Sequence, residues 1–290
     1  MTICPMTEAE MAERRRFEGF RTVCYKNRFW ESVHHGFYVP IHTMARLEER
    51  ELGRPSFFCW GLRATLRDGG AAANGVLPMH LLTDAAGYTM ESLPAKRRSD
   101  LRKCLRLVKI VRLTGPAVLM DEGFRIVSSA KRRTKYDYGR YFSEDRFGEY
   151  AKYFTTDPKH VVLAGLVEEK LAGFLIGYAV GKTAYIKALP LDSAYLPTAI
   201  STGLVYEFAQ VCRRSGIIEE VSYGQETPED SSLGYFKEGL GFPVVKIPTR
   251  FWFPKLILNY IRRKAPEKFY RLTGAAAGPS QAHSDTPAEG

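Results

Sequence analysis

The stretch HVVLAGLVEEKLAGFLIGYAVGKTAYIKALPL, residues 160–191, contains three apolar runs separated by two short turn sequences. The runs cover 160–167, 170–180 and 183–191, with Glu168-Glu169 and Gly181-Lys182 between them. Apolar runs of this length, rich in β-favouring residues and joined by two-residue turns, are typical of hairpins. The stretch therefore predicts a three-stranded antiparallel meander.

Helical patterns flank this meander on both sides. Two helices are predicted before it, at 122–134 and 144–154. After it, Pro197 is expected to open a long helix that stops at Gly216, followed by a strand at 217–223. Thr227, with Pro228 and Asp230 behind it, then predicts the start of another helix, and 242–248 predicts a last strand. This order predicts an α+β domain with a mixed, largely antiparallel sheet flanked by helices, and it excludes a doubly wound nucleotide fold.

The chain before residue 115 contains a similar mixture of elements. Residues 56–67 and 76–82 predict two strands of a hairpin, and a basic helix begins near Ser92 and Pro94. We therefore divide the chain into two halves, 1–115 and 116–250, followed by a basic amphipathic extension at 251–273. The last residues, 274–290, are small and polar and predict a disordered tail.

Composition narrows the class of protein. The 290 residues are 45% hydrophobic and 26% charged, with a net charge of +10, which excludes disorder for most of the chain. No apolar stretch approaches the roughly 20 residues of a membrane span. Five cysteines stand singly, without a CxxC pair, and the charged N-terminal stretch lacks a secretion signal. These features indicate a cytoplasmic protein.

The predicted order of elements resembles that of the GNAT acyltransferase superfamily. In that superfamily, the loop after the fourth strand and the next helix start hold the pyrophosphate of coenzyme A, because free N–H groups suit phosphate. The corresponding stretch is 189–199, although the family's Gln/Arg-x-x-Gly-x-Gly/Ala fingerprint is absent. The resemblance implies acyl-CoA, with acetyl-CoA as the first candidate, as co-substrate. The cofactor-binding residues that it implies are Leu189, Leu191, Ser193, Tyr195, Thr198 and Ala199.

A narrower resemblance comes from LGYFKEGLGF, residues 233–242. It is similar to the F-K-x-G-F-G element of Fem-type peptidoglycan aminoacyltransferases and of related GNAT-like proteins of polysaccharide and cell-envelope gene clusters. Those proteins carry two tandem GNAT-like halves, and residues 90–102 are similar to the basic helix before their catalytic half. The resemblance covers about residues 55–250.

Three residues are candidates for catalysis. In the Fem-type relatives, the lysine matching Lys237 lies by the acyl carbonyl, where an ammonium stabilises an oxyanion; otherwise Lys237 is a surface lysine near a helix end. Tyr235 lies one residue from the position where many GNAT enzymes place a tyrosine that protonates the leaving thiolate. Glu226 is a candidate base for the attacking amine, or a loop carboxylate.

Four further residues are candidates for substrate binding. Tyr223 and Gln225 follow a strand at the expected pocket floor. Phe236 is either a core residue or one whose carbonyl faces the acceptor. Asp192 is either an acid beside the substrate amine or a turn aspartate. The histidines have no metal-ligand spacing, so no metal is predicted.

Two basic features remain open to more than one interpretation. Lys96 to Lys109 carries seven basic residues, and a second cluster contains Lys131, Arg132, Arg133 and Lys135. Each is either a solvated face or a groove for coenzyme A or a charged tRNA. Residues 253–263 carry apolar side chains at helical spacing opposite basic ones. This helix either rests on an anionic membrane or packs on the domain, and we favour packing.

The sequence therefore predicts an acyltransferase that moves an acyl group from a thioester to an amine, such as an amino sugar or cell-envelope precursor. The alternatives are an aminoacyl-tRNA-dependent Fem-type aminoacyltransferase and a non-catalytic GNAT-like binding module. The expected location is cytoplasmic, with peripheral contact at the inner face of the membrane.

Overall fold

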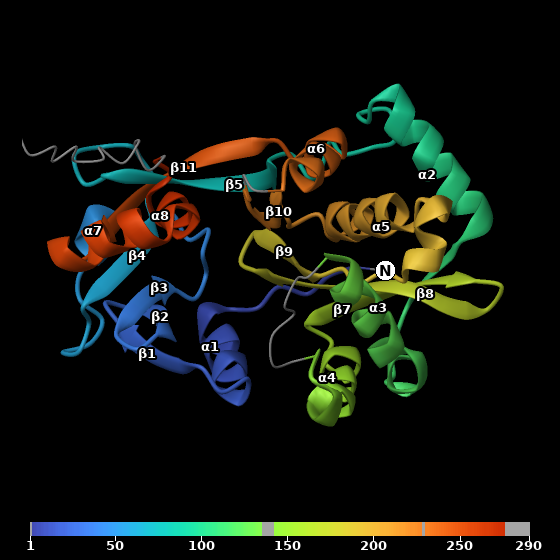
Figure 1. Ribbon diagram of the computed structural model, residues 1–290, viewed down its shortest axis with the longest axis horizontal. Coiled ribbons are helices and arrows are strands. Elements are labelled where there is room, and N and C mark those ends of the chain that lie inside the picture. The colour runs from blue at the N-terminus through green and yellow to red at the C-terminus, as the bar shows by residue number, and fades with distance from the viewer. Residues whose placement is uncertain (1, 135–141, 228–229, 276–290) are drawn as a thin grey trace, which may run out of the picture. The chain divides into compact units, whose positions relative to one another are not determined.

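A computed structural model describes residues 2–134, 142–227 and 230–275 (Figure 1). The predicted tail lies almost wholly outside these residues. The α-helices are α1 Glu8–Phe17, α2 Ala95–Leu107, α3 Phe124–Thr134, α4 Glu144–Thr156, α5 Ile200–Ser215, α6 Ser231–Gly239, α7 Lys255–Lys264 and α8 Pro266–Thr273. The strands are β1 Arg21–Tyr25, β2 Arg28–His34, β3 Phe37–Pro40, β4 Gly61–Thr65, β5 Gly75–Leu82, β6 Lys109–Arg112, β7 His160–Val167, β8 Lys170–Val180, β9 Thr183–Ala188, β10 Glu220–Gln225 and β11 Val244–Trp252.

The described residues form two compact units whose segments alternate along the chain. Unit 1 comprises residues 2–14, 79–226 and 230–245, and unit 2 comprises 15–78, 227 and 246–275. That residues 1–115 and 116–250 are two GNAT-like halves stays a prediction. No helix in the described part of the chain is long and apolar enough to cross a bilayer.

The sheet of unit 1 has the strand order β5-β10-β9-β8-β7-β6. β7, β8 and β9 pair antiparallel in sequence order, so the predicted meander is confirmed. Glu168 and Glu169 turn the chain between β7 and β8 with φ of 49° and 62°, the left-handed pair that a tight hairpin turn requires. Mixed pairing with helices around it confirms the α+β prediction.

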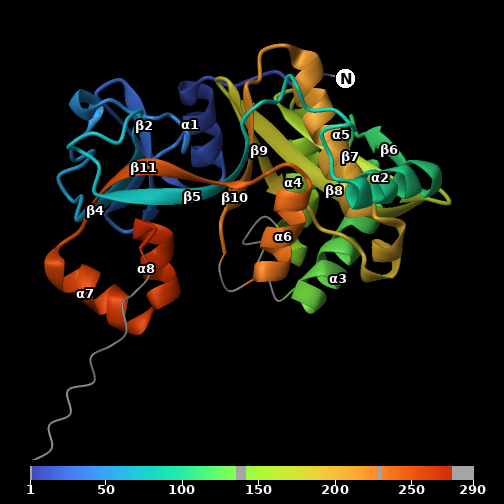
Figure 2. The same ribbon diagram turned by 90° about the horizontal axis from the view of Figure 1, so that it is seen from above.

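Helices cover both faces of this sheet (Figure 2). On one face, α2 and α5 bury Leu101 and Phe208 in a core that also takes apolar side chains of β7 to β10. On the other face, α3 and α4 bury Ile126 and Phe154 against alternate residues of β7 and β8. The alternation follows from strand geometry, because successive side chains point to opposite faces.

The sheet of unit 2 corrects one prediction. β4 and β5 were expected to form a hairpin, but the strand order is β4-β11-β5, so β11 lies between them. Thr249 of β11 stands opposite Thr65 of β4, and its carbonyl accepts a hydrogen bond from the N–H of Asn74 at 3.1 Å. A strand distant in sequence, β11, therefore supplies the backbone partners of β4 that the sequence analysis expected from β5.

The predicted helix starts need two further corrections. Pro197 lies inside a 3₁₀ helix, Ser193–Thr198, and α5 begins only at Ile200, after Ala199 in the left-handed conformation at φ 58°. Helix α6 is capped by Asp230, which accepts the N–H of Leu233 at 3.0 Å, and not by Thr227. Pro228 lies outside the described residues. The predicted stop at Gly216 is confirmed, at φ 71°.

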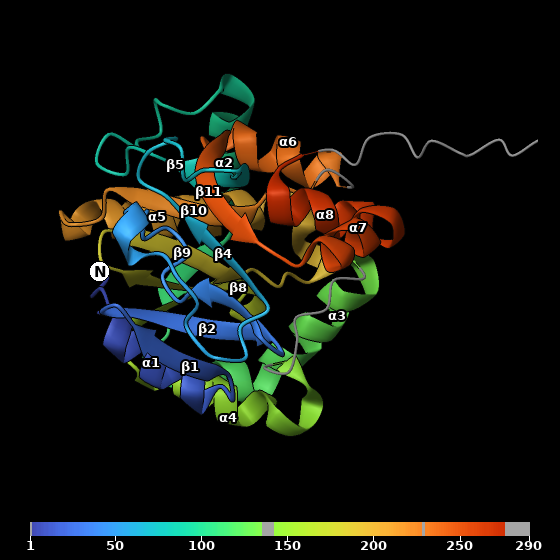
Figure 3. The same ribbon diagram turned by 90° about the vertical axis from the view of Figure 1, so that its left-hand side faces the viewer.

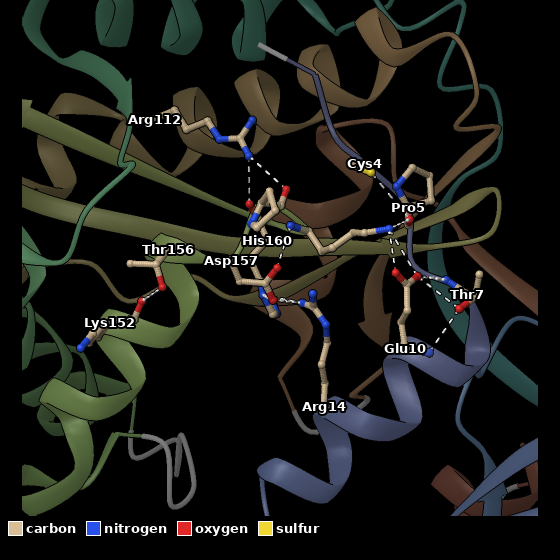
Figure 4. Close-up of polar contacts among 12 residues, drawn as sticks. Cys4, Pro5, Thr7, Glu10, Arg14, Arg112, Lys152, Thr156, Asp157 and His160 are labelled. Atoms are coloured by element: carbon tan, nitrogen blue, oxygen red, sulfur yellow. Dashed lines mark hydrogen bonds and ion pairs between the residues drawn. The ribbon is translucent and has the colours of Figure 1, made fainter.

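The N-terminal segment is held to unit 1 by a polar cluster around β7 (Figure 4). Arg14 forms an ion pair with Asp157, and its Nη1 lies 3.0 Å from Nδ1 of buried His160. Lys159 donates to the carbonyl of Pro5 at 2.9 Å. Burial acts to raise the pKa of Asp157, but its contacts with His160, the Lys159 N–H and Arg14 outweigh burial and hold that pKa well below its ordinary value.

Replacing Asp157 with Asn is expected to destabilise the protein by about 1–3 kcal/mol at pH 7, the usual contribution of hydrogen bonds to a charged group. Because the folded-state pKa is depressed, this stability is present above the ordinary pKa of 3.8 and is lost as pH falls below it. Urea unfolding at pH 7 and pH 3 should therefore show a wild-type advantage that shrinks in acid. The exposed Glu169, replaced with Gln, is the control and should change little. An advantage for wild type that is equal at both pH values would contradict the argument.

Candidate active site

Strands β9 and β10 run side by side and then separate, all within unit 1. Their parallel pairing joins Thr183 to Glu220 and ends where Tyr185 meets Ser222, although both strands continue beyond these residues. In its remaining part β9 carries an extra residue against β8, since Ile176 faces Ala188 and Gly177 faces Ile186. β10 is irregular against β5 after Ser222, with Gly224 at φ 82°. The carboxyl ends of these two neighbouring parallel strands therefore no longer pair with each other.

The N-terminal end of α5, or its mouth, lies at the same edge of the sheet. Helix α5 connects β9 to β10, and a helix that returns between parallel strands begins near the carboxyl end of the first. The first N–H groups of any α-helix have no acceptor within the helix. The N–H groups of Ile200, Ser201 and Thr202 therefore supply donors and a positive helix end at this edge.

The 189–199 loop packs on the α5 side of the sheet. Leu191 is buried in the core of that side, and Leu189, Tyr195 and Ala199 pack against it. Two polar side chains of the loop already have hydrogen-bond partners in the protein. The hydroxyl of Thr198 donates to the carbonyl of Tyr195 at 2.7 Å, and Ser193 Oγ accepts from Arg133 at 3.2 Å. The loop therefore offers mainly backbone N–H and C=O groups to a bound ligand.

Asp192 is held in a hydrogen-bonded network. Its carboxylate forms an ion pair with Arg125 and accepts hydrogen bonds from Ser129 Oγ at 3.1 Å and from the Ala194 N–H at 3.2 Å. Burial acts to raise the pKa of Asp192, but the Ala194 N–H and Arg125 outweigh burial and lower it. The side chain caps the 3₁₀ helix, which is the turn role left open by the sequence.

Lys237 is the buried residue of α6, with 6% of its surface exposed. Its Nζ lies 5.1 Å from the centre of the Tyr223 ring. Tyr223 is the first residue of β10 beyond the part of that strand that pairs with β9. No described carboxylate forms an ion pair with this ammonium. Burial lowers the pKa of Lys237 to about 8, and the charge of Asp230 opposes this shift only partly. The site therefore holds a poorly solvated positive charge beside the end of β10.

A pH dependence follows if this ammonium acts in its charged form. Transfer, measured as kcat/KM, should fall as pH rises through about 8, because Lys237 loses its proton there. Lys237→Arg keeps the charge at every accessible pH. The activity that remains in Lys237→Arg should therefore not fall as pH rises through this range. A wild-type profile that keeps rising from pH 8 to 10 would contradict a role for the protonated amine.

The other predicted residues of this region divide into two groups. Phe236 packs against the core of the α5 side, where Arg97 of α2 lies 5.0 Å from its ring centre. Gln225 and Glu226 are half-buried at the end of β10. Tyr235, in contrast, is 67% exposed on the side of α6 away from Lys237. Lys237 and Tyr223 are thus in contact at the end of β10, Glu226 follows that strand, and Tyr235 lies apart from them.

His80 is one of the histidines for which the sequence shows no metal-ligand spacing. It is buried on β5, and its Nδ1 lies 3.0 Å from the carbonyl of Phe242, so Nδ1 carries the proton. Burial lowers the pKa of His80, and the charge of Lys237 lowers it further, while Glu238 and Glu226 oppose this. A neutral imidazole with its Nε2 lone pair free to accept therefore lies within electrostatic reach of Lys237. The signal in the sequence was a single histidine inside an apolar strand.

Helix α2 brings its basic residues to the same side of unit 1. Leu101 and Cys104 are buried against α5, and Arg97 reaches α6. The remaining basic face is open, and its exposed members are Lys96, Arg102, Lys103 and Arg106. This arrangement suits an anionic ligand that extends past the mouth of α5.

Comparison with known proteins finds similarity of structure only, since no family model and no curated protein sequence matches the chain. The C-terminal domain (DUF2156) of a putative lysylphosphatidylglycerol synthetase from Agrobacterium fabrum is 12% identical, with a TM-score of 0.57 over 84% of this chain and 89% of that one. L-PGS from Bacillus licheniformis is 13% identical, with a TM-score of 0.57 over 94% and 99%. FemX is 8% identical, with a TM-score of 0.57 over 86% and 92%. The chain therefore has a GNAT-like, Fem-like fold.

Proposed function

We propose that this protein, on its GNAT-like and Fem-like fold, is an acyltransferase that moves an acyl group from a thioester donor such as acyl-CoA to an amine. The observation that carries the proposal is Lys237, a buried ammonium without an ion-pair partner among the described residues. A buried ammonium that the Tyr223 ring and the charge of Asp230 compensate only in part is costly to a folded protein, so a ligand that develops negative charge beside it explains its presence best.

In the proposed reaction, the acceptor amine attacks the acyl carbonyl carbon and forms a carbon–nitrogen bond. The carbonyl oxygen becomes an oxyanion, which the Lys237 ammonium stabilises. The carbon–sulfur bond then breaks, and the thiolate leaves and takes up a proton. The amine loses its proton to Glu226 or to the neutral imidazole of His80, directly or through water. Tyr235 is too exposed in this conformation to be our first candidate for protonating the thiolate.

The donor would lie where β9 and β10 separate, with its anionic part at the mouth of α5. The backbone N–H groups of that helix start suit a pyrophosphate, and the basic face of α2 extends the positive surface. The absence of the glycine fingerprint implies that 189–199 would contact the phosphates differently from a typical GNAT loop. The acceptor class, an amino sugar or a cell-envelope precursor, rests on the Fem-type resemblance.

A second candidate is transfer from an aminoacyl-tRNA. The open basic face of α2 favours it, because a groove that follows a nucleic-acid backbone needs several exposed cations. The chemistry at Lys237 would be the same, with an ester oxygen leaving in place of sulfur. A non-catalytic binding module is the third hypothesis, and it leaves the buried ammonium without an explanation.

Thermal-shift measurements with a panel of acyl-CoA thioesters and with charged tRNA test the proposal. A ligand at 100 times its Kd stabilises the folded protein by about 2.7 kcal/mol, which is readily measured. We expect stabilisation by a thioester, and by the same thioester in Lys237→Met, where binding survives and transfer does not. Tight tRNA binding without thioester binding would favour the second candidate. Binding of neither would leave only the binding module.

A further inference from the structure

Unit 2 exposes large apolar side chains in two places. Phe57 and Phe58 are 94% and 72% exposed, and their rings touch edge to face at 5.3 Å. On α7, Leu256 and Tyr260 are 85% and 66% exposed. They stand four residues apart, so they share one face of the helix. The expectation that α7 packs its apolar face on the domain is therefore wrong for these two residues.

The two exposed sites are joined by one cluster of aromatic rings. Phe253, just before α7, stacks on Phe37 with ring centres 5.0 Å apart and lies 6.1 Å from Trp60. Trp60 follows the Phe57-Phe58 pair by two residues, and its indole N–H donates to the carbonyl of His35. The loop and the start of α7 are thus anchored on the same rings within unit 2.

Basic residues surround the exposed face of α7. Residues 254–273 contain six basic residues and one acid, a net charge of +5. The exposed basic residues are Lys255, Arg262, Arg263, Lys264 and Lys268. Helices α7 and α8, drawn in red, pack side by side in Figure 3, so these charges belong to one small region.

We propose that Phe57, Phe58 and the Leu256–Tyr260 face of α7 form a membrane-docking surface that binds anionic phospholipid bilayers. Aromatic and aliphatic side chains bordered by cations match the boundary between acyl chains and anionic headgroups. A soluble protein partner or a second copy would need shape complementarity but has no need for this excess of positive charge. The docking surface does not depend on the proposed chemistry, because none of its residues belongs to the candidate active site.

Vesicle co-sedimentation tests this surface with the full chain. We expect binding to vesicles containing 30 mol% phosphatidylglycerol and little binding to pure phosphatidylcholine vesicles. Phe57→Ser with Phe58→Ser should weaken binding at least tenfold at low and at high salt, because two rings no longer enter the bilayer. Arg262→Gln with Arg263→Gln should weaken it about tenfold or more at low salt only, since salt screens the charges.

Ile217→Ser provides the matched control, because Ile217 is an exposed apolar residue of unit 1, outside the surface. It should bind vesicles as wild type does. All substituted side chains are exposed or charged, so unchanged thermal unfolding is expected and should be measured. Equal binding by wild type and the Phe variant would overturn the proposal. So would loss of a dimer in sedimentation velocity in the Phe variant without any vesicle binding by wild type, which would make the surface a self-association interface.

Discussion

Lys237→Met is expected to abolish transfer and to stabilise the protein in the same experiment. Loss of one oxyanion-stabilising donor lowers kcat by about 10²–10³-fold in well-studied enzymes, and we expect a decrease of this size or larger. The folded state, in contrast, should become more stable. Burial lowers the pKa of Lys237 to about 8 from an ordinary 10.5, which means that the folded state disfavours its charge.

The sign of the stability change follows from linkage. Between pH 8 and 10.5 the unfolded chain binds more protons than the folded chain, so the wild type gains stability as pH rises through this window. At pH 7 the full penalty is present, and an apolar residue of similar length removes it. We expect Lys237→Met to be more stable than wild type by about 1–3 kcal/mol at pH 7, at roughly 1.4 kcal/mol per pKa unit.

Urea unfolding and a transfer assay with the identified donor measure both effects. Lys246→Met is the control, because Lys246 is exposed and the same substitution there should leave activity and stability nearly unchanged. Full activity in Lys237→Met would remove the lysine from the mechanism. Loss of stability in that variant would instead assign Lys237 a structural role.

Gly203→Ala is expected to destabilise the protein by about 1–3 kcal/mol, in the range of overpacked cores. A methyl group at Gly203 of α5 would lie 2.2 Å from the sulfur of Cys104 on α2. The two helices can approach closely only because residue 203 has no side chain. The change should also weaken donor binding, since it pushes the basic helix α2 away from the mouth of α5.

A double-mutant cycle separates this contact from a general effect on the helix. Cys104→Ala removes the clashing sulfur, so the double variant should be more stable than the sum of the single changes predicts, by about 1 kcal/mol or more. Gly148→Ala on α4 is the matched control. A methyl group there meets nothing within 4 Å, so the same substitution should stabilise the protein by about 0.5–1 kcal/mol. Equal effects at Gly203 and Gly148 would contradict the close approach of α2 and α5.

The fold of unit 1 was largely predictable because its signals are local. The turn residues Glu168, Glu169 and Gly181 and the apolar runs between them define the meander within one short stretch. The partner of β4 was not predictable in this way. It comes from β11, and a pairing between strands so far apart in sequence leaves no local pattern.

The candidate site was predictable only in part. The motif around Lys237 indicated a lysine of interest, but its burial beside Tyr223 depends on how α6 packs on β10. Asp192 looked equally suited to substrate binding and to a turn, and the choice depends on Arg125, a residue of α3. His80 was missed because its neighbour Phe242 and the charge of Lys237 both come from the other end of the chain.

The proposed chemistry depends most on where the acyl carbonyl lies. A crystal structure with a ketone analogue of the accepted donor, in which a methylene group replaces the acyl oxygen or sulfur link, shows this directly. We expect the analogue between the separated ends of β9 and β10, with its carbonyl oxygen about 3 Å from Nζ of Lys237. An analogue bound on the α3 and α4 face of the sheet, or with its carbonyl beyond hydrogen-bonding reach of that nitrogen, would contradict the proposed chemistry.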